Sequence, residues 1–576
     1  NDVFFSGNGG FAATGSALTV TLNSAAEIDW SAGTGFNGKV LQLGSPTSTA
    51  SVELTNDIDL DNNRNIRLFN NSSSNDDISI LSGNIERDGS NNRNLTIEGS
   101  GTLVLGGANN FGTGILYVGN SGPSSVVRAT DGVGLPTSAK LYFNNGVLES
   151  SGSFTRNIGT GNGEVYWNNK GGFAANGGPL TVNLEGGIAL NWGDTNAGFR
   201  GQDPLYLGSD TADDVVTFQN GIILNGDRNI QVTDNPDSDS DYAVITGVVS
   251  QSGTRKLDKE GDGTLVFEGN NTYTGTTTIN GGTLIINGDC SAANGLVDVR
   301  NGSGQFLGGT GTLGGNVTLE NNTGLTFDLS TAPGSHDKLD ISGSLTFESN
   351  SVLTLTSSGG ASTGTFTLAT AAGGISGSVP ATVNLPVDWT ADAPQIVGND
   401  LVINITSVGA VSSPYDTWLA SYDFSEFTSP DLTTAGDPDN DTLSNLLDFA
   451  FGTDPTDPVL GSLTYNAGPP ATFSAGTPTV THSSPGGGGV SFKARYVRRV
   501  DHGDPGSVSY SLRFSSDLSD WESSTAETAP DWVAELNPVQ LAVDGDYELI
   551  EVDYPWFLDS GPKARFFQVE VTEVTP

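Results

Sequence analysis

Residues 271–284 read NTYTGTTTINGGTL, and this stretch decides the fold of the chain. Its β-branched and small polar residues form short extended segments, and Asn-Gly-Gly at 280–282 supplies the turn conformations that separate them. Similar short segments with alternating residues occur elsewhere, as in LTVTL at 18–22 and VLQL at 40–43. No segment up to about residue 405 has a convincing helical period. The sequence therefore predicts an all-β fold built from many short strands.

Composition narrows the choice among all-β folds. Glycine makes up 78 of 576 residues without a Gly-X-Y period, which excludes a collagen triple helix. Apolar residues make up 35% of the chain, which argues against disorder. A sandwich or a propeller would also fit many short strands with Gly and Asn corners. A β-solenoid is favoured because polar and small residues alternate over several hundred residues, so that each turn buries its inward row by stacking on the next.

The charge of the chain limits its partners. Its 66 acidic and 23 basic residues give a formal net charge of −43. This charge repels phosphate backbones and anionic lipid head groups, so nucleic acid and membrane surfaces are not expected partners, whereas divalent cations are natural counterions. No apolar run approaches the ~20 residues of a membrane-spanning helix. The single cysteine, Cys290, cannot form an internal disulfide.

The chain contains two copies of one long unit, which we place at residues 1–162 and 163–285. Residues 1–13 align with residues 163–175 without a gap. Further along, Leu18 matches Leu180, Trp30 matches Trp192, and Arg64-Asn65-Ile66 matches Arg228-Asn229-Ile230. We expect matched residues to occupy equivalent places in a stack of turns, with the two leucines and the two isoleucines pointing inward. A terminal solenoid or β region is expected over residues 286–405.

The stretch 271–284 resembles the passenger-associated β-strand repeat of bacterial autotransporters. GGTGTLGGNV at 308–317 is similar to the turn that usually follows that repeat. The resemblance covers about residues 1–405. It implies an exported chain that folds as a long right-handed parallel β-solenoid.

Residues 406–459 are expected to form a short helical connector. Ser412, Ser413 and Pro414 are typical of a helix start. The following stretch 437–448, DPDNDTLSNLLD, places oxygen ligands at positions 1, 3, 5, 7, 9 and 12 of an EF-hand-type loop. The predicted Ca²⁺ ligands are Asp437, Asp439, Asp441, Leu443 through its carbonyl, Asn445 and Asp448.

This loop departs from the EF-hand pattern at two positions. Thr442 stands where glycine usually makes the turn, and Asp448 is shorter than the usual glutamate. The alternative is an acidic linker held by hydrogen bonds from backbone N–H groups to aspartate side chains. Together with FAFGTDP at 449–455, the stretch resembles the calcium-binding Asp-rich repeats of dockerins and thrombospondin type 3 modules. That resemblance also implies Ca²⁺.

Residues 460–576 return to a strand period, as in FKARYV at 492–497 and FFQVEV at 566–571. We expect a compact antiparallel β-sandwich here. The order of solenoid, Asp-rich loop and sandwich is similar to that of large exported proteins of the Verrucomicrobia–Planctomycetes kind. The tryptophans of this region fit either the sandwich core or a sugar-stacking platform: Trp521, Trp532 and Trp556.

Signatures of catalysis are weak. The acidic residues at 258–262 lie in what is most simply a polar turn, His336 lacks a nucleophile elbow, and Cys290 has no recognisable histidine partner. We therefore predict a non-enzymatic structural or adhesive protein, extracellular or on the outer surface of a bacterium. The alternatives are a polysaccharide-active solenoid enzyme and a carbohydrate-binding module on a solenoid stalk. Surface glycans are candidate partners.

The chain is also predicted to polymerise with itself, head to tail. Asn1 to Phe5 already match the repeat strand Gly163 to Trp167, so we expect no capping turn before the first turn of the solenoid, which either a removed upstream segment or another subunit would then cover. An exposed terminal strand invites the addition of another strand. Because the charge of −43 opposes assembly, calcium or salt should promote it.

Overall fold

The chain folds into two compact units, Asn1–Gly409 and Ala410–Pro576, and each is described by itself. The computed structural model describes residues 3, 5, 7–31, 39–87, 89–120, 122, 124–193, 198–199, 204–329, 336–358, 362–408, 414–424, 427, 430–468, 471–483, 491–503, 507–519, 521–525, 532–533, 536–555, 558 and 563–574. The predicted first strand, Asn1 to Phe5, and the predicted helix cap at Ser412 and Ser413 fall largely or wholly outside these residues.

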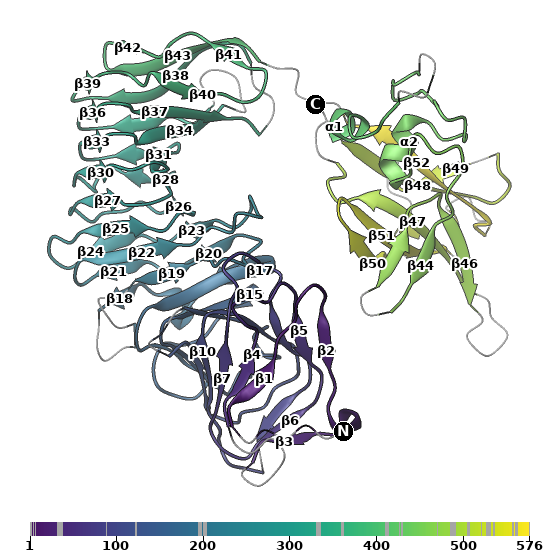
Figure 1. The fold of residues 1–576 in the computed structure, drawn as a ribbon. Coiled ribbons are helices and arrows are strands. Elements are labelled where there is room, and N and C mark those ends of the chain that lie inside the picture. The colour runs from purple at the N-terminus through teal and green to yellow at the C-terminus, as the bar shows by residue number, and fades with distance from the viewer. Residues whose placement is uncertain are drawn as a thin grey trace. The chain divides into compact units, whose positions relative to one another are not determined.

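The first unit is a stack of parallel strands in which paired strands lie two or three strands apart in the sequence (Figure 1). This is the arrangement of a β-solenoid. One ladder is β1 (Gly9–Phe11), β4 (Leu41–Leu43), β7 (Arg64–Leu68), β10 (Leu95–Gly99), β12 (Ile115–Val118), β14 (Lys140–Phe143) and β16 (Val165–Trp167). A second is β2 (Leu18–Val20), β5 (Val52–Leu54), β8 (Ser79–Leu81), β11 (Gly101–Leu105), β13 (Ser125–Arg128), β15 (Gly146–Phe154) and β17 (Gly171–Val182), and a third is β3 (Ile28–Asp29), β6 (Ile58–Leu60) and β9 (Ile85–Arg87).

Beyond β17 the stack continues in further parallel ladders. One is β19 (Leu205–Leu207), β22 (Arg228–Val232), β25 (Leu257–Glu260), β27 (Thr277–Ile279), β30 (Val297–Val299), β33 (Val317–Leu319), β36 (Leu345–Phe347) and β39 (Ile375–Gly377). Another is β20 (Val216–Phe218), β23 (Ala243–Ile245), β26 (Thr264–Phe267), β28 (Thr283–Ile286), β31 (Phe306–Gly308), β34 (Gly324–Asp328), β37 (Val352–Thr356) and β40 (Thr382–Asn384). Shorter ladders are β18 (Leu190–Trp192), β21 (Ile222–Leu224) and β24 (Val249–Gln251), and β29 (Asp289–Cys290), β32 (Thr312–Leu313), β35 (Leu339–Ile341) and β38 (Gly364–Ala371).

Inward-facing residues of successive turns form one continuous apolar core. A single row of paired, almost fully buried residues runs up the first ladder: Leu41, Ile66, Ile97, Val118, Phe143 and Trp167. Each of these side chains covers the one in the next turn, so apolar area is removed from water by stacking rather than by a central cluster. The prediction of an all-β chain with stacked parallel strands is confirmed.

The two repeat copies build the same buried contact. The side chain of Arg64 is buried and donates through Nε to the carbonyl oxygen of Trp30 at 2.8 Å, with its guanidinium 5.8 Å from the Trp30 ring centroid. Arg228 donates to the carbonyl oxygen of Trp192 at 3.3 Å and lies 5.9 Å from that ring. The predicted equivalence of these arginines and tryptophans is confirmed.

The prediction of inward-pointing apolar residues holds for three of the four residues. Ile66, Ile230 and Leu180 are buried, whereas Leu18 is 38% exposed, so the prediction for Leu18 is wrong. In β17, Leu180 has β15 on one side, opposite Gly152, and β20 on the other. Among the described strands, β2 pairs with β5 alone, which leaves the Leu18 side chain uncovered on one side.

Antiparallel strands close one face of the stack after its last parallel turns. β43 (Asp400–Ser407) runs antiparallel to β38, and β42 (Gln395–Val397) and β41 (Thr390–Ala391) pair antiparallel with β43. Antiparallel pairing here occupies the edge groups that a further parallel strand would use.

The second unit combines two short helices with antiparallel sheets. The helices are α1 (Pro414–Leu419) and α2 (Asn445–Phe451). One sheet contains β46 (Thr479–Ser483), β47 (Ser491–Arg499), β51 (Tyr547–Asp553) and β50 (Val539–Asp544); the other contains β49 (Trp521–Ser523), β48 (Val508–Ser515) and β52 (Phe566–Glu573); β44 (Thr464–Asn466) and β45 (Thr472–Ser474) form a hairpin. Ala494 and Ile550 from the first sheet and Leu512 and Phe514 from the second share one buried cluster.

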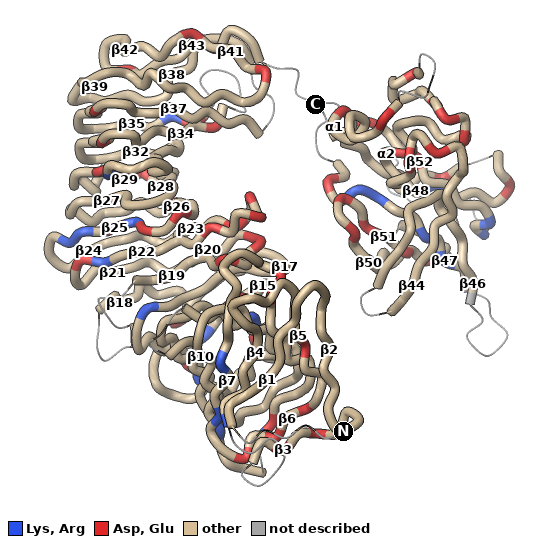
Figure 2. Tube along the Cα trace, viewed as in Figure 1, with Lys and Arg blue, Asp and Glu red and all other residues tan. Residues whose placement is uncertain are grey.

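Charge is unevenly placed along the chain. Figure 2 shows acidic residues gathered in the loop beside β20 and β23 and again around the helices of the second unit. None of the helices in the described part of the chain is long and apolar enough to cross a membrane.

Candidate metal centre

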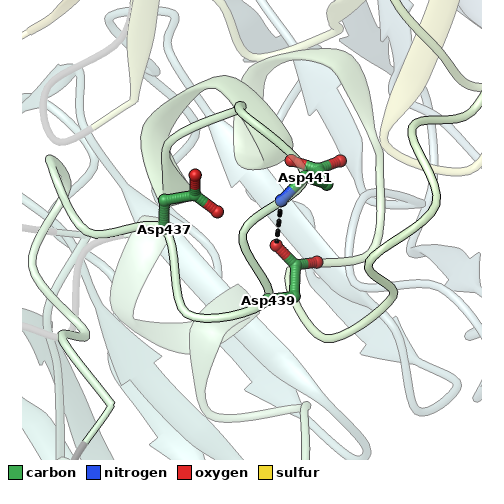
Figure 3. A group of neighbouring side chains, drawn as sticks. All are labelled: Asp437, Asp439 and Asp441. Atoms are coloured by element: carbon green, nitrogen blue, oxygen red, sulfur yellow. Dashed lines mark hydrogen bonds between the residues drawn. The ribbon is translucent and has the colours of Figure 1, made fainter.

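Three aspartates of the second unit converge in the loop that precedes α2 (Figure 3). One carboxylate oxygen from each of Asp437, Asp439 and Asp441 lies within 4.8 Å of the others. Asp439 and Asp441 are 7% and 8% exposed. Three carboxylates this close, two of them on buried residues, repel one another unless a cation lies between them.

Hydrogen bonds from the backbone hold the loop in shape. The N–H groups of Asp441, Thr442 and Leu443 donate to carboxylate oxygens of Asp439 (3.2 Å), Asp437 (3.2 Å) and Asp441 (2.7 Å). These are the bonds that the acidic-linker alternative also expects. They therefore do not separate a metal loop from a linker.

The turn itself carries backbone strain at the position where the sequence departs from the EF-hand pattern. Thr442 has a φ of 84°, in the left-handed region that glycine adopts at little cost. A β-branched residue pays for this conformation in free energy. The loop thus keeps the tight turn of the pattern although Thr442 replaces its glycine.

The metal-loop interpretation accounts for unpaired oxygens that the acidic-linker alternative leaves without a partner. Four buried side-chain oxygens have no hydrogen-bond partner within the described part of the chain: Oδ1 of Asp437, Oδ2 of Asp439, Oδ1 of Asn445 and Oδ2 of Asp448. An unsatisfied buried acceptor costs about 1–3 kcal/mol, so buried acceptors are normally paired. Four unpaired acceptors on a loop and its following helix fit a hard cation that takes oxygen ligands.

Asn445 is held in place from outside the loop. Its Nδ2 donates to the carbonyl oxygens of Asp431 and Thr433, both at 2.9 Å, and its backbone N–H donates to Gly436 at 2.7 Å. Both amide hydrogens are used, so the side-chain oxygen is left as the free acceptor. The spacing of the loop was enough to predict Asn445 as a ligand. The supporting role of Asp431 and Thr433 could not be predicted, because they accept hydrogen bonds through backbone carbonyls, which leave no signal in the sequence.

Asp448 lies in the first turn of α2 and is 1% exposed. Thr453 Oγ1 donates to its Oδ1 at 2.6 Å. Burial raises the pKa of Asp448 to about 7, and the carboxylates of the preceding loop add to the rise. Burial also raises the pKa of Asp439 to about 6, with further contributions from its acidic neighbours. Both carboxyl groups would gain from a neutralising cation.

The structure brings three of the six predicted ligands into one close group, to which Asp448 does not belong. Asp437, Asp439 and Asp441 form the close group, and Asn445 and Asp448 each offer a buried unpaired oxygen from α2. The backbone N–H of Leu443 belongs to the loop's hydrogen bonds. A ligand role for the Leu443 carbonyl stays a prediction.

Helix α2 ties this loop to both sheets of the second unit. Tyr510 donates its hydroxyl to the carbonyl oxygen of Ala450 at 2.6 Å, and Tyr547 donates to that of Phe449 at 3.0 Å. The guanidinium of Arg499 lies 4.3 Å from the centroid of the Phe449 ring. A change that orders the loop should therefore also restrain α2 and, through these contacts, β47, β48 and β51.

Other candidate residues take structural positions. Cys290 is buried, and burial raises the pKa of its thiol. Nε2 of His336 lies 2.8 Å from the carbonyl oxygen of Thr367. Trp532 is 1% exposed and packs in the core shared by the two sheets, as the packing alternative expects, while Trp556 lies outside the described residues.

Comparison with known proteins bears on the first unit. Two segments match the passenger-associated-transport-repeat family model. They are residues 95–119, which hold β10 to β12, and residues 257–286, which hold β25 to β28. Because Leu95 pairs with Arg64 and Leu257 pairs with Arg228, the passenger repeat falls on equivalent turns of the two copies. The resemblance predicted for residues 271–284 is confirmed, and the stretch 308–317 lies outside the matched segments.

A curated relative is similar over a short stretch. The chain is 39% identical over 79 residues to the Adhesin BmaC autotransporter of Brucella suis biovar 1 (strain 1330). This alignment covers 14% of the chain and 2% of the adhesin, so the chain matches a small part of that relative's length. No solved structure matches the chain significantly.

Proposed function

We propose that this protein is a non-enzymatic adhesive or structural element, extracellular or on the outer surface of a bacterium. In this proposal it consists of a right-handed parallel β-solenoid, a calcium-bound connector and a C-terminal β-sandwich. The observation that carries the proposal is the passenger repeat, which matches equivalent turns of both copies in a parallel stack. The similarity of 79 residues to an autotransporter adhesin supports the adhesive role.

Surface exposure is tested on intact cells of the source bacterium. Antibodies against the full chain should label unpermeabilised cells, and external protease should remove the label while a cytoplasmic marker remains intact. Labelling that requires permeabilisation would contradict the proposal.

We further propose that the loop before α2 binds one Ca²⁺. The ligands would be Asp437, Asp439, Asp441, the carbonyl of Leu443, Asn445 and Asp448. Unpaired buried oxygens on four of these residues support this assignment. A set of carboxylate, amide and carbonyl oxygens suits Ca²⁺, which accepts irregular geometry, better than Mg²⁺, which demands a near-ideal octahedron.

The raised carboxyl pKa values predict a specific pH dependence. In the metal-free fold, Asp439 and Asp448 hold protons up to about pH 6 and 7, where the unfolded chain has already lost them. Proton binding by Asp439 and Asp448 therefore stabilises the metal-free fold. This stabilisation is fully present below about pH 4 and is lost as the pH rises through 6 to 7. Calcium requires deprotonated ligands, so its affinity should rise across the same window.

Isothermal titration of calcium at pH 5, 6 and 7.5, in two buffers of different ionisation enthalpy, measures both effects. We expect tighter binding and less proton release at the highest pH. Affinity that is independent of pH would contradict the assignment of Asp439 and Asp448 as ligands.

Head-to-tail assembly through the N-terminal turn stays a prediction from the sequence. If it holds, light scattering of the full chain should show growth of large particles when millimolar calcium is added, since the cation screens the charge of −43. Electron microscopy of the same sample should show fibres. Protein that stays monomeric at high concentration with calcium would refute it.

A further inference from the structure

A cavity of about 260 Å³ lies in the first unit where the two repeat copies meet. The first copy contributes residues of β11 and β13 and the loop at 74–78, and the second contributes β19, β22 and the loop at 208–211. The copies also touch directly, because Asn75 Nδ2 donates to Asp237 Oδ2 at 2.6 Å. The cavity therefore exists only where one copy is folded onto the other.

A buried ion pair fixes one wall of this cavity. Glu149 is fully buried and accepts hydrogen bonds from Arg128 Nε at 2.7 Å and from Ser209 Oγ at 2.5 Å. The hydroxyl of Thr211 donates to the same carboxylate. Ser209 and Thr211 flank the cavity-lining Asp210, so the loop is held in one conformation before any ligand arrives. A preformed site spends less binding free energy on ordering itself.

The lining is amphipathic. Val126, Val147 and Tyr206 form an apolar patch that belongs to a small buried cluster. Facing the cavity are polar side chains that make no hydrogen bond within the described part of the chain: Asn70, Asp210 and Gln231. Although Asp210 is exposed as a residue, loss of water around its carboxyl group raises its pKa. Asp210 is exposed and Asn70 and Gln231 are half-buried, so a ligand in the cavity would take the place of water at these donors and acceptors.

Charge and geometry disfavour two classes of ligand, anions and metal ions. The residues that line the cavity include neither Lys nor Arg, and two cations that contact lining residues are engaged: Arg128 with Glu149, and Lys170 over the Tyr206 ring. An anionic ligand would therefore meet Asp77 and Asp210 without compensation. In the described part of the chain, these two carboxylates do not belong to a close acidic group like that before α2, which disfavours a metal ion.

We propose that this cavity binds a neutral saccharide of one or two rings. Sugar hydroxyl groups would pair with Asp210, Gln231 and Asn70, and the C–H face of the ring would lie against the apolar patch. A cavity of about 260 Å³ is just below the ~300 Å³ lower limit of typical small-molecule sites, which suits a ligand of this size. This inference rests on the proposed adhesive function and names the class of ligand.

Titration of the full chain with neutral sugars tests the site. The probes are glucose, galactose, mannose, N-acetylglucosamine and cellobiose, with glucuronic acid as the anionic comparison. At least one neutral sugar should bind with one-to-one stoichiometry, and Asp210→Asn and Gln231→Ala should each weaken it tenfold or more. Asp340→Asn changes an exposed acid on β35 outside the cavity and should leave binding unchanged.

Each variant is first checked for an unchanged circular dichroism spectrum and melting temperature, and Gln231→Ala carries the test if Asp210→Asn fails to fold. The inference is overturned if no neutral sugar binds, if glucuronic acid binds more tightly, or if folded cavity variants bind as the wild type does. A bead-attachment assay distinguishes failure of the cavity proposal from failure of the proposed adhesive function. In this assay, beads coated with the protein are applied to surfaces. Beads that attach equally well with Gln231→Ala sink the cavity proposal and leave the adhesive function standing, whereas wild-type beads that never attach sink the adhesive function itself.

Discussion

Calcium should raise the melting temperature of the second unit by about 5–10 °C when the free ion is a hundred times its dissociation constant. Binding at that ratio adds about 2.7 kcal/mol to the folded state, and 1 kcal/mol shifts the melting temperature of a domain of this size by about 2–4 °C. The shift should reach the sheets because α2 is hydrogen-bonded to Tyr510 and Tyr547. Differential scanning calorimetry with calcium and then with chelator measures it.

The variant Asp439→Asn sharpens this test. Asparagine keeps the shape of the side chain but removes one charge from the close group of three. The calcium-dependent shift should shrink or vanish, while the calcium-free protein should melt at a higher temperature because repulsion is relieved. Asp454→Asn is the matched control, since Asp454 is an exposed residue that follows α2 and whose Oδ1 accepts a local backbone N–H. A full calcium shift in Asp439→Asn would contradict the site.

Trp192→Ala should destabilise the first unit by about 3–5 kcal/mol, the range for removing a large buried aromatic side chain. Trp192 is 1% exposed, packs 5.3 Å from the ring of Phe199 and carries the guanidinium of Arg228. Because Trp30 and Arg64 repeat this contact, Trp30→Ala should have a similar effect. Urea unfolding followed by circular dichroism measures both.

Asn191→Ala provides the control for the tryptophan variants. Asn191 neighbours Trp192 on β18 but is exposed, so its truncation should change the free energy of unfolding by less than about 0.5 kcal/mol. If Trp192→Ala lowers the free energy of unfolding no more than Asn191→Ala does, the stacked apolar side chains are not what stabilises this unit.

Periodicity and internal repetition made much of the first unit predictable. The period of two fixes which side chains face inward, and matched positions in the two copies then share an environment, as Arg64 and Arg228 do. Leu18 departs from this rule because burial depends on the strand that lies next to it, not on its own sequence. The contact between Asn75 and Asp237 could not be predicted from the sequence either, since it depends on how one copy folds onto the other.

The candidate metal centre also has a part that the sequence predicts and a part that depends on the tertiary structure. Aspartates at fixed spacing within one loop are local information, and the structure places Asp437, Asp439 and Asp441 together as the spacing predicted. The groups that hold Asn445 and Asp448 come from backbone carbonyls before the loop and from Thr453 after the helix. Such supporting contacts follow from the tertiary structure, for which the sequence has no spacing rule.

Attachment under flow tests the central claim most directly. Beads coated with the full chain in calcium are applied to surfaces of neutral polysaccharide and of protein, beside beads coated with albumin. We expect beads that carry the chain to resist a shear that removes the albumin beads on at least one surface, without release of reducing sugar from the polysaccharide. Detachment at the same shear as albumin on every surface, or release of sugar by the protein, would contradict a non-enzymatic adhesive role.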